Sequence, residues 1–226
     1  DGNVLVRIDF SSLNFKDALI LNNGGRIVKK YPFVPGIDFS GTVEESEDEK
    51  FKKDDKVILT GFRVGEIYYG GFSQYAKVNS DFLVKLPKDL TNKKAMMMGT
   101  AGLTALLCSF AVKAKEELLM GSKVKDVLVT GATGGVGSFA VMALSKMGYD
   151  VHAVTGKKDK HDYLKKLGAK NILDRKEFLG ESKLLEKGLW DCVVDNVGGE
   201  GLTKILAQTK PGGIVALPGN AGGVKI

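Results

Sequence analysis

The stretch Val127–Lys158, VLVTGATGGVGSFAVMALSKMGYDVHAVTGKK, decides the fold of this chain. A short β-branched run, Val127–Thr130, leads into a glycine-rich turn, and an apolar pattern with spacings of three and four follows the turn. A second β-branched run, Val151–Val154, closes the stretch. This order predicts strand, turn, helix and parallel strand, which together are the βαβ unit of a doubly wound α/β sheet.

The turn has the A/G-x-G-x-x-G form that binds a dinucleotide pyrophosphate. Gly134 lets the backbone approach the phosphates, Gly137 lets the helix pack against the strand, and the helix N-terminus offers free N–H groups. A turn that binds no ligand is the alternative, but the predicted strand before it and helix after it favour the binding site. The predicted contacts are Thr133, Gly134, Gly135, Val136 and Gly137.

The end of the second strand separates NAD from NADP. An NAD site typically has Asp or Glu there, which accepts hydrogen bonds from the ribose hydroxyls. This chain has Thr155, Gly156, Lys157 and Lys158 instead, and Arg175 follows the next predicted strand. A carboxylate would repel a 2′-phosphate, whereas threonine, lysine and arginine bind it. The sequence therefore predicts NADP(H), with solvated loop lysines as the alternative.

The chain divides into two parts of different periodicity. Up to about residue 95, one predicted helix, Asn14–Leu21, interrupts short β signals that turn residues bound. After that point strands and helices alternate, which predicts a parallel sheet covered on both faces. We expect a β-rich substrate domain over 1–95 and a nucleotide-binding domain over 96–226 that is incomplete at its C-terminal end. The predicted strands are 4–8, 41–45, 56–60, 72–78, 83–86, 126–130, 150–154, 171–173, 191–195 and 213–217; the later helices are 91–98, 101–115, 135–147, 159–167, 181–187 and 200–208.

Composition limits the possible partners. The 226 residues carry a net charge of +6 that is spread along the chain, which is typical of a solvated surface or of a protein with a phosphorylated ligand. No basic block with interleaved aromatic residues occurs, so we expect no nucleic-acid partner. We find no apolar run of about 18–20 residues and expect no membrane partner. Cys108 and Cys192 lie in apolar contexts, which fits a reducing, cytoplasmic location.

The β-rich part lacks the residues that hold a catalytic zinc. Such a zinc is bound by cysteine and histidine, but both cysteines and both histidines, His152 and His161, fall in the second part. We therefore predict no metal. Neither a G-x-S-x-G motif nor a cysteine–histidine pair is present, so acyl-enzyme chemistry is not expected.

Four stretches resemble the zinc-free medium-chain dehydrogenase/reductases, and within them the acrylyl-CoA reductase branch that is often labelled quinone oxidoreductase-like. They are SSLNFKDAL (Ser11–Leu19), YPFVPGIDFSGTV (Tyr31–Val43), GTAGLTALL (Gly99–Leu107) and VTGATGGVGS (Val129–Ser138). The resemblance covers essentially the whole chain. It implies a GroES-like β-barrel domain, incomplete here, beside a Rossmann domain, and it implies a homodimer. It also implies NADPH-dependent reduction of an activated carbon–carbon double bond, first of all in acrylyl-CoA.

In zinc-containing relatives a metal-binding cysteine takes the place of Asn14 and a His-Glu pair that of Ile37 and Asp38, which agrees with the prediction of no zinc. Two departures from the branch matter. The branch has tyrosine where this chain has Phe15, so a hydroxyl near the cofactor is lost. Members are also longer at both ends, and we expect this stretch alone to be inactive.

The resemblance suggests which residues carry the reaction. Hydride addition to the β-carbon would build negative charge on the carbonyl oxygen, which hydrogen-bond donors must stabilise when zinc is absent. The Asn14 amide is the first candidate and Lys16 the second, while Asp17 would orient Lys16 or a ribose hydroxyl. The alternatives are that Asn14 caps its helix and that Lys16 and Asp17 form a surface pair.

Loops should supply the remaining contacts. Loops after parallel strands face the cofactor. GTAG (residues 99–102) would bring Thr100 close to the nicotinamide, with a tight turn between two helices as the alternative. The expected cofactor contacts in these segments are Phe15, Thr100, Asn196, Val197, Gly219 and Asn220. Arg26, Lys29 and Lys30 form a basic stretch that would meet CoA phosphates, with a solvated loop as the alternative.

Other functions stay open at this point. A quinone or general enone reductase would need no CoA. A regulatory protein could keep the NADPH site and lose turnover, and a purely structural role has no support in the sequence.

Overall fold

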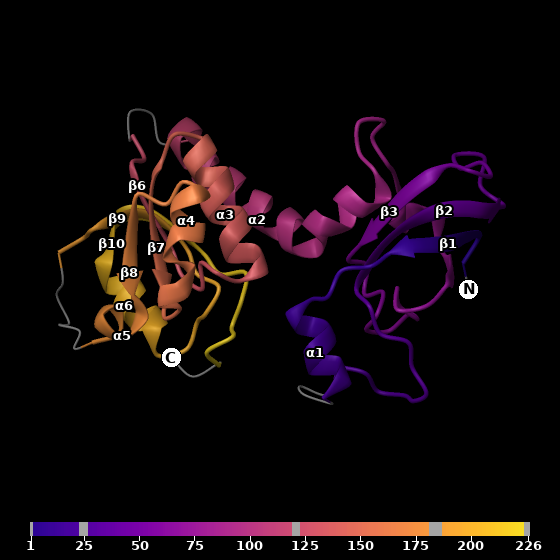
Figure 1. The fold of residues 1–226 in the computed structure, drawn as a ribbon, viewed down its shortest axis with the longest axis horizontal. Helices are drawn as coiled ribbons and strands as arrows, with labels where there is room; N and C mark the ends of the chain where they lie inside the picture. The colour runs from indigo at the N-terminus through magenta and orange to yellow at the C-terminus, as the bar shows by residue number, and fades with distance from the viewer. Residues whose placement is uncertain (1, 23–26, 119–122, 181–186, 224–226) are drawn as a thin grey trace. The chain divides into compact units, whose positions relative to one another are not determined.

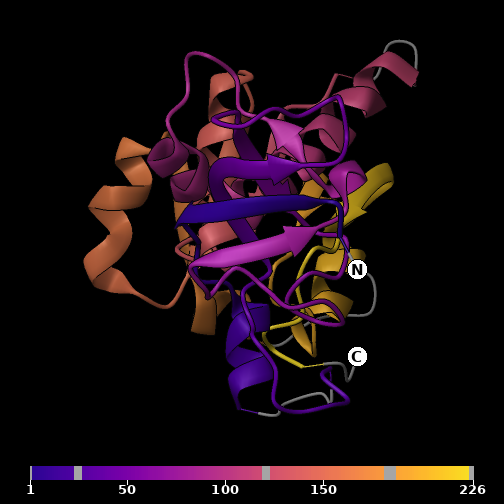
Figure 2. The same ribbon diagram turned by 90° about the vertical axis from the view of Figure 1, so that its right-hand side faces the viewer.

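The computed structural model describes residues 2–22, 27–118, 123–180 and 187–223, which form two compact units, Asp1–Ala101 and Gly102–Ile226. The described part of the first unit holds a five-stranded sheet in the order β4-β1-β2-β3-β5, and all its strand pairs are antiparallel. The strands are β1 (Val4–Phe10), β2 (Asp38–Ser46), β3 (Lys56–Thr60), β4 (Tyr75–Val78) and β5 (Val84–Lys85). Figure 2 looks onto the strands of this unit.

Alternation places one face of this first sheet in a core. Val4 and Val6 on β1 are fully buried, as are Val57 and Leu59 on β3. Their spacing of two is that of a strand with one buried face. The helix α1 (Phe15–Leu21), a short 3₁₀ turn, η2 (Ser80–Phe82), and the first residues of helix α2 (Asn92–Leu118) also belong to this unit.

The second unit has a parallel sheet in the order β10-β9-β6-β7-β8 among its described residues (Figure 1). The sheet comprises β6 (Asp126–Val129), β7 (Asp150–Thr155), β8 (Asn171–Asp174), β9 (Trp190–Val194) and β10 (Thr209–Ala216). In chain order this is 3-2-1-4-5, the Rossmann arrangement, with the strand order reversing between β6 and β9. The predicted α/β fold is confirmed.

Helices cover both faces of the parallel sheet, as the pattern of buried residues shows. Val127 and Val129 of β6 pack in one core with α2 (Asn92–Leu118), α3 (Gly135–Lys146) and α4 (His161–Lys166). Leu128, between them, packs in another core with α5 (Arg175–Phe178) and α6 (Gly201–Gln208). A strand buried on both faces reads as a continuous apolar run, which explains the VLV of β6.

Several boundaries differ from the sequence prediction. The predicted helices 91–98 and 101–115 are the two helical parts of α2, which meet at a kink where the backbone of Gly99 is not helical (φ 51, ψ −157). Predicted strand 72–78 begins only at Tyr75, and α5 was not predicted, because four residues are too few for a helical pattern. Most of predicted helix 181–187 lies outside the described residues.

The long helix α2 also changes the expectation about apolar runs. Within the described residues it is the one helix long and apolar enough to cross a membrane by length and composition. The prediction missed it because glycine, serine and threonine interrupt a stretch, 95–112, that has no charged side chain. Ala105, Cys108 and Val112 on this helix pack in the core of the second unit, which is typical of a core helix.

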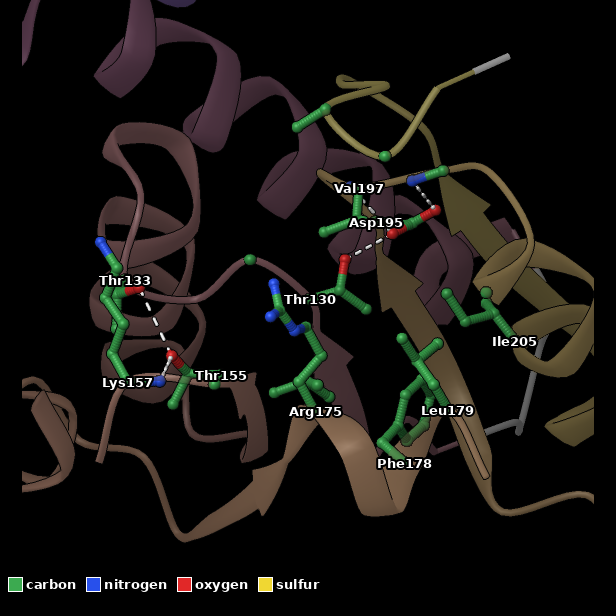
Figure 3. Close-up of a pocket in the computed structure, with 17 residues that line it drawn as sticks. Thr130, Thr133, Thr155, Lys157, Arg175, Phe178, Leu179, Asp195, Val197 and Ile205 are labelled. Carbon is green, nitrogen blue, oxygen red and sulfur yellow. Dashed lines mark hydrogen bonds between the residues drawn. The ribbon is translucent and has the colours of Figure 1, made fainter. Parts of the chain in front are cut away.

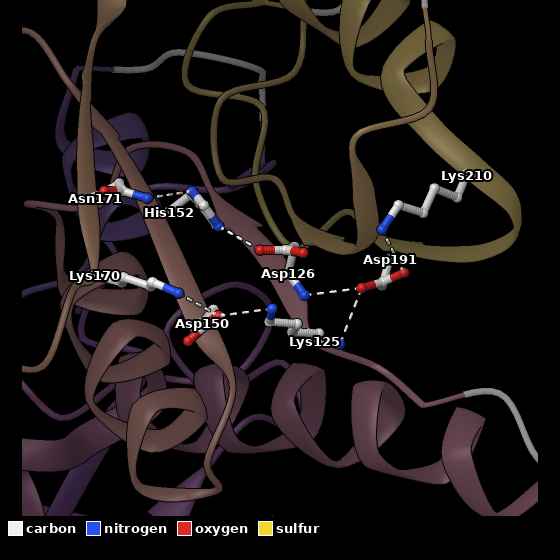
Figure 4. A network of polar contacts seen from close by, with 8 residues as sticks. All are labelled: Lys125, Asp126, Asp150, His152, Lys170, Asn171, Asp191 and Lys210. Carbon is white, nitrogen blue, oxygen red and sulfur yellow. Dashed lines mark hydrogen bonds and ion pairs between the residues drawn. The ribbon is translucent and has the colours of Figure 1, made fainter.

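Acidic residues tie the amino ends of the parallel strands together (Figure 4). Asp191 accepts the backbone amides of Lys125 at 2.9 Å and Asp126 at 2.8 Å. The Asp126 carboxylate contacts Nε2 of His152 at 2.9 Å, and Asp150 pairs with Lys170 at 2.6 Å. These contacts lie at the edge opposite to the carboxyl ends, where ligands bind in such sheets.

Candidate functional site

A cavity of about 340 Å³ opens at the carboxyl ends of the parallel strands (Figure 3). This is the edge and the switch point where a Rossmann sheet binds its dinucleotide. Residues predicted to contact the cofactor that line it are Thr133, Thr155, Gly156, Lys157, Arg175 and Val197. Residues that line it without having been predicted are Thr130, Gly131, Val154, Phe178, Leu179, Asp195, Gly198, Gly201, Ile205, Ala221 and Gly222.

The glycine turn has the conformation that a phosphate site requires. Gly131 has a positive φ of 56°, and a Cβ on Gly137 would lie 2.3 Å from the Gly131 carbonyl oxygen. Gly137 is therefore needed for close packing of helix and turn. A Cβ on Gly134 would meet only that same oxygen, at 3.3 Å, so space in front of the turn stays open. Gly134 is the N-cap of α3, and Gly135, Val136 and Gly137 begin that helix with amides that have no intrahelical partner.

Two cations lie where an NAD site has its acid. The Arg175 guanidinium lies over Gly156: a Cβ there would be 3.2 Å from Arg175 Nε. Figure 3 shows this guanidinium pointing into the pocket, with Lys157 along another wall. The Thr155 hydroxyl accepts the Lys157 amide at 3.1 Å and lies 3.4 Å from that of Thr133. Lys158 does not line the pocket; it begins the 3₁₀ turn η3 (Lys158–Lys160).

The pocket also holds a buried carboxylate that sequence reasoning missed. Asp195 accepts the Thr130 hydroxyl and the amides of Val197 at 3.1 Å and Gly198 at 3.0 Å. It is fully buried, and these donors compensate its desolvation. The signal that could have identified Asp195 is its position as an acid directly after an apolar strand. Asp195 thus fixes the loop that follows β9.

Asn196 and the last described loop complete this wall. Asn196 donates from Nδ2 to the Thr130 carbonyl at 2.8 Å, while its buried Oδ1 has no partner among the described atoms. That oxygen is an acceptor that a ligand donor would satisfy. Gly219 and Asn220 do not line the pocket, but a Cβ on Gly219 would lie 2.5 Å from the Asn196 carbonyl. Gly219 therefore lets this loop pack against Asn196, and the prediction that Gly219 and Asn220 contact the cofactor stays a prediction.

The first unit contains a separate polar cluster around Asp38. This carboxylate is fully buried and accepts hydrogen bonds from three residues. Ser12 donates its amide at 3.0 Å and its hydroxyl at 2.7 and 2.8 Å; Thr100 donates its amide at 2.8 Å and its hydroxyl at 2.7 Å. Asn14 Nδ2 lies 3.1 Å from Asp38 Oδ2. Thr100, which the sequence analysis places beside the nicotinamide, thus donates hydrogen bonds to Asp38.

Gly99 makes this cluster possible. Its backbone angles (φ 51, ψ −157) lie in a region that residues with a side chain rarely adopt. A Cβ there would lie 2.5 Å from the Ser12 hydroxyl and 3.0 Å from Asp38 Oδ2. Only glycine therefore lets the amide of Thr100 reach Asp38.

Asn14 and Lys16 have different freedom to act as donors. Asn14 Nδ2 donates to the Ser12 hydroxyl at 3.0 Å as well as to Asp38, so both amide hydrogens have acceptors. Lys16 Nζ donates to Glu66 at 2.8 Å and has two further N–H groups. The Lys16 side chain is 46% exposed.

Asp17 has a place that the sequence prediction did not give it. Its carboxylate accepts the amide of Asn14 at 2.8 Å and that of Ile37 at 3.1 Å, at the start of α1. Lys16 pairs with Glu66 instead. Burial raises the pKa of Asp17, while the hydrogen bonds from the backbone of Asn14 and Ile37 lower it. Asp17 therefore caps α1 and does not orient Lys16. Phe15, next to it, is 59% exposed.

The donor set does not suit a metal ion. No group of three or more His, Cys, Asp or Glu residues that could hold one occurs in the part of the chain that the structure describes. Ile37 is buried in an apolar cluster with Ile20 and Val28. Cys108 and Cys192 are buried, and burial raises the pKa of both thiols, as expected for inert core cysteines. The prediction that the protein binds no zinc stays a prediction.

Two family comparisons match the two parts of the chain. Residues 1–88 match the alcohol dehydrogenase GroES-like domain, and residues 135–226 match the zinc-binding dehydrogenase family. A relative, the acrylyl-CoA reductase AcuI of Ruegeria pomeroyi, is 50% identical over 98% of this chain and 67% of its own length.

Two solved structures are also similar. The Escherichia coli protein YhdH with bound NADPH has a TM-score of 0.93 and 47% identity, over 100% of this chain and 69% of that one. The Bacillus subtilis protein YhfP with NAD bound has a TM-score of 0.90 and 43% identity, over 100% and 68%. YhfP is named a putative quinone oxidoreductase.

Proposed function

Because the chain belongs to the medium-chain dehydrogenase/reductase superfamily, we propose that it reduces an activated carbon–carbon double bond with NADPH, with acrylyl-CoA as its substrate. The observation that carries the cofactor preference is the pair of cations, Lys157 and Arg175, beside Thr155 and Gly156. A 2′-phosphate would meet both cations and no carboxylate there. The similar protein crystallised with NADPH supports the same choice.

NADPH, when bound, supplies a hydride to the β-carbon of the substrate. The charge that then develops on the carbonyl oxygen needs a donor that is not already committed. Lys16 keeps N–H groups beyond the one directed at Glu66, whereas the amide hydrogens of Asn14 are directed at Asp38 and Ser12. We therefore place Lys16 ahead of Asn14, the reverse of the order expected from the sequence. Asn14 and Asp38 act as positioning residues.

We also propose that this chemistry needs no zinc. The residue in the position of the relatives' histidine, Ile37, is apolar and buried, and both oxygens of Asp38 are engaged by protein donors. Dialysis of the full-length protein against EDTA should leave its rate of NADPH oxidation unchanged. Loss of activity that zinc alone restores would contradict the proposal.

A quinone reductase is the second candidate, because YhfP carries that name and was crystallised with NAD. The deciding experiment follows the absorbance of NADPH, and in parallel of NADH, with acrylyl-CoA and with a simple quinone, using the full-length protein. Oxidation of NADPH by acrylyl-CoA alone would support our proposal. Oxidation by quinone alone would replace it, and binding of NADPH without oxidation would favour a regulatory protein.

A further inference from the structure

The lining residues of a groove in the first unit differ from those of the pocket at the parallel sheet and from those of the Asp38 cluster. Two cavities, of about 270 and 470 Å³, share Lys30, Phe33 and Ile67 in their walls, and we call them together the Lys30 groove. Its walls are the segments 27–33 and 63–70, with Tyr75, Ala76 and Lys77 at one end. The larger cavity falls in the range of about 300–1,000 Å³ that is typical of small-molecule sites.

The Lys30 groove is basic. Its charged lining residues are Lys29, Lys30, Arg63, Lys77 and one acid, Glu66. Lys29 and Lys30 are exposed, and neither has an ion-pair partner among the described residues. Unpaired cations in a hollow attract a ligand with several negative charges, above all phosphates.

Its other wall is aromatic. Tyr31, Tyr69 and Tyr75 line the larger cavity and are 56%, 64% and 52% exposed. Tyr69 lies against Phe33, with ring centroids 5.6 Å apart and planes at 51°. Exposed rings beside cations form the kind of platform on which nucleobases stack. The groove therefore fits a ligand that combines a base with phosphates.

The backbone that presents Arg63 is strained. Phe62 and Arg63 both have positive φ, 53° and 61°, which residues other than glycine rarely adopt. The Arg63 carbonyl accepts the amides of Glu66 at 3.1 Å and Ile67 at 2.9 Å, which closes the loop tightly. Residues held in such conformations cluster at ligand sites.

The Lys30 groove is connected to the candidate donor of the reaction. Glu66, in its wall, accepts Lys16 Nζ at 2.8 Å and lies 4.0 Å from Arg63 Nε. A phosphate near Arg63 would compete for that arginine and leave Glu66 to Lys16. A ligand in the groove thus lies one residue away from Lys16.

We infer that the Lys30 groove binds the adenosine 3′,5′-bisphosphate end of a CoA thioester. Lys29, Lys30 and Arg63 would hold the phosphates, and the tyrosine wall would hold the adenine. This inference rests on the proposed function for the thioester, and it names the residues that separate a CoA ester from a free enone or a quinone.

Kinetics on two substrates test the inference in the full-length protein. The double variant Lys29→Ala/Lys30→Ala should lower kcat/KM for acrylyl-CoA about tenfold, as expected for the loss of roughly one charged hydrogen bond. The same variant should lower kcat/KM far less for acrylyl-pantetheine, because this substrate lacks the nucleotide. The matched control, Lys52→Ala/Lys53→Ala, removes another exposed lysine pair of the same unit. Equal losses on both substrates, or none, would overturn the inference.

Direct binding separates this inference from the proposed function. With NADPH saturating, calorimetry should detect adenosine 3′,5′-bisphosphate binding to the wild type and to the control. Binding should be about tenfold weaker in Lys29→Ala/Lys30→Ala and in Tyr69→Ala. This result would support the groove even if acrylyl-CoA were not reduced. Absence of binding to the wild type, or equally tight binding of AMP, would overturn the CoA assignment.

Discussion

At the scale of single residues, we propose that Arg175 and Lys157 bind the 2′-phosphate that distinguishes NADPH from NADH. A charged hydrogen bond to phosphate is worth about 1.5–3 kcal/mol, or roughly tenfold to a hundredfold in affinity. We expect Arg175→Ala to raise KM for NADPH by about that factor and to leave KM for NADH unchanged. Lys158→Ala, one residue from Lys157 but outside the pocket lining, is the control. A parallel loss with NADH would mean that Arg175 does not read the phosphate.

Lys16 and Asn14 allow a second test at the residue scale. Loss of one donor to a developing oxyanion costs about 10²–10³ in kcat. We expect Lys16→Met to lower kcat by such a factor and Asn14→Ala to lower it less, because Asp38 keeps the donors of Ser12 and Thr100. Lys85→Met, which breaks an ion pair of similar exposure with Asp55, is the control. The opposite order in single-turnover rates would restore Asn14 as the donor.

The residue scale also shows where prediction from sequence reached its limit. Thr155, Lys157 and Arg175 were predicted because strand ends in a parallel sheet converge on one edge. Asp195 and the Asp38 cluster were missed, since a buried acid reads like any other until its hydrogen-bond donors are placed. The role of Asp17 was missed for the same reason, because the sequence does not show that its carboxylate oxygens accept backbone amides.

At the scale of elements, one glycine in α2 has two structural effects. Gly99 interrupts the helix and lets Thr100 reach Asp38. The sequence predicted the two helical parts on either side of GTAG, but not that the break between them brings Thr100 to Asp38.

We predict that Gly99→Ala destabilises the protein strongly. The change adds backbone strain of about 1–3 kcal/mol and a contact of 2.5 Å with the Ser12 hydroxyl. Gly148→Ala is the matched control, because Gly148 also has positive φ (92°) but nothing within 4 Å of an added Cβ. Thermal unfolding should show a larger fall in Tm for Gly99→Ala. Equal falls would mean that the Asp38 cluster adjusts without cost.

At the scale of the whole molecule, acid should unfold the protein through the strand-end network. The pKa of Asp191 is lowered: burial raises it, but hydrogen bonds from the Asp126 and Lys125 amides and from Lys210 outweigh burial. The hydrogen bond from Lys170 lowers the pKa of Asp150. A carboxyl with a lowered folded-state pKa contributes stability above its unfolded pKa, near 3.9, and loses it as pH falls through the folded value.

Denaturant unfolding between about pH 6 and 2 tests this expectation. Stability should fall below about pH 4, and Asp191→Asn should be less stable at neutral pH with a shallower acid slope. Asp17, whose pKa is raised, works in the opposite direction. An unchanged slope in Asp191→Asn would move the acid sensitivity elsewhere.

The architecture of the whole chain was predictable because its two parts differ in period. Short strands with apolar residues at every second position indicated the first unit. Strands that alternate with helices along the chain indicated the second. The strand ends were not predictable, because pairing across the sheet decides them, and α5 was not predictable, because four residues are too few for a helical pattern. The homodimer and the cytoplasmic location stay predictions.

The separation of the two edges of the parallel sheet has a consequence for engineering. The hydrogen bonds and ion pairs of Asp126, Asp150 and Asp191 lie at the amino ends of the strands. Lys157 and Arg175, which we propose select the nucleotide, line the pocket at the carboxyl ends. Distant sites contribute nearly additively to stability. A designer could therefore change the residues around Arg175 to alter the coenzyme preference without destabilising the strand-end network.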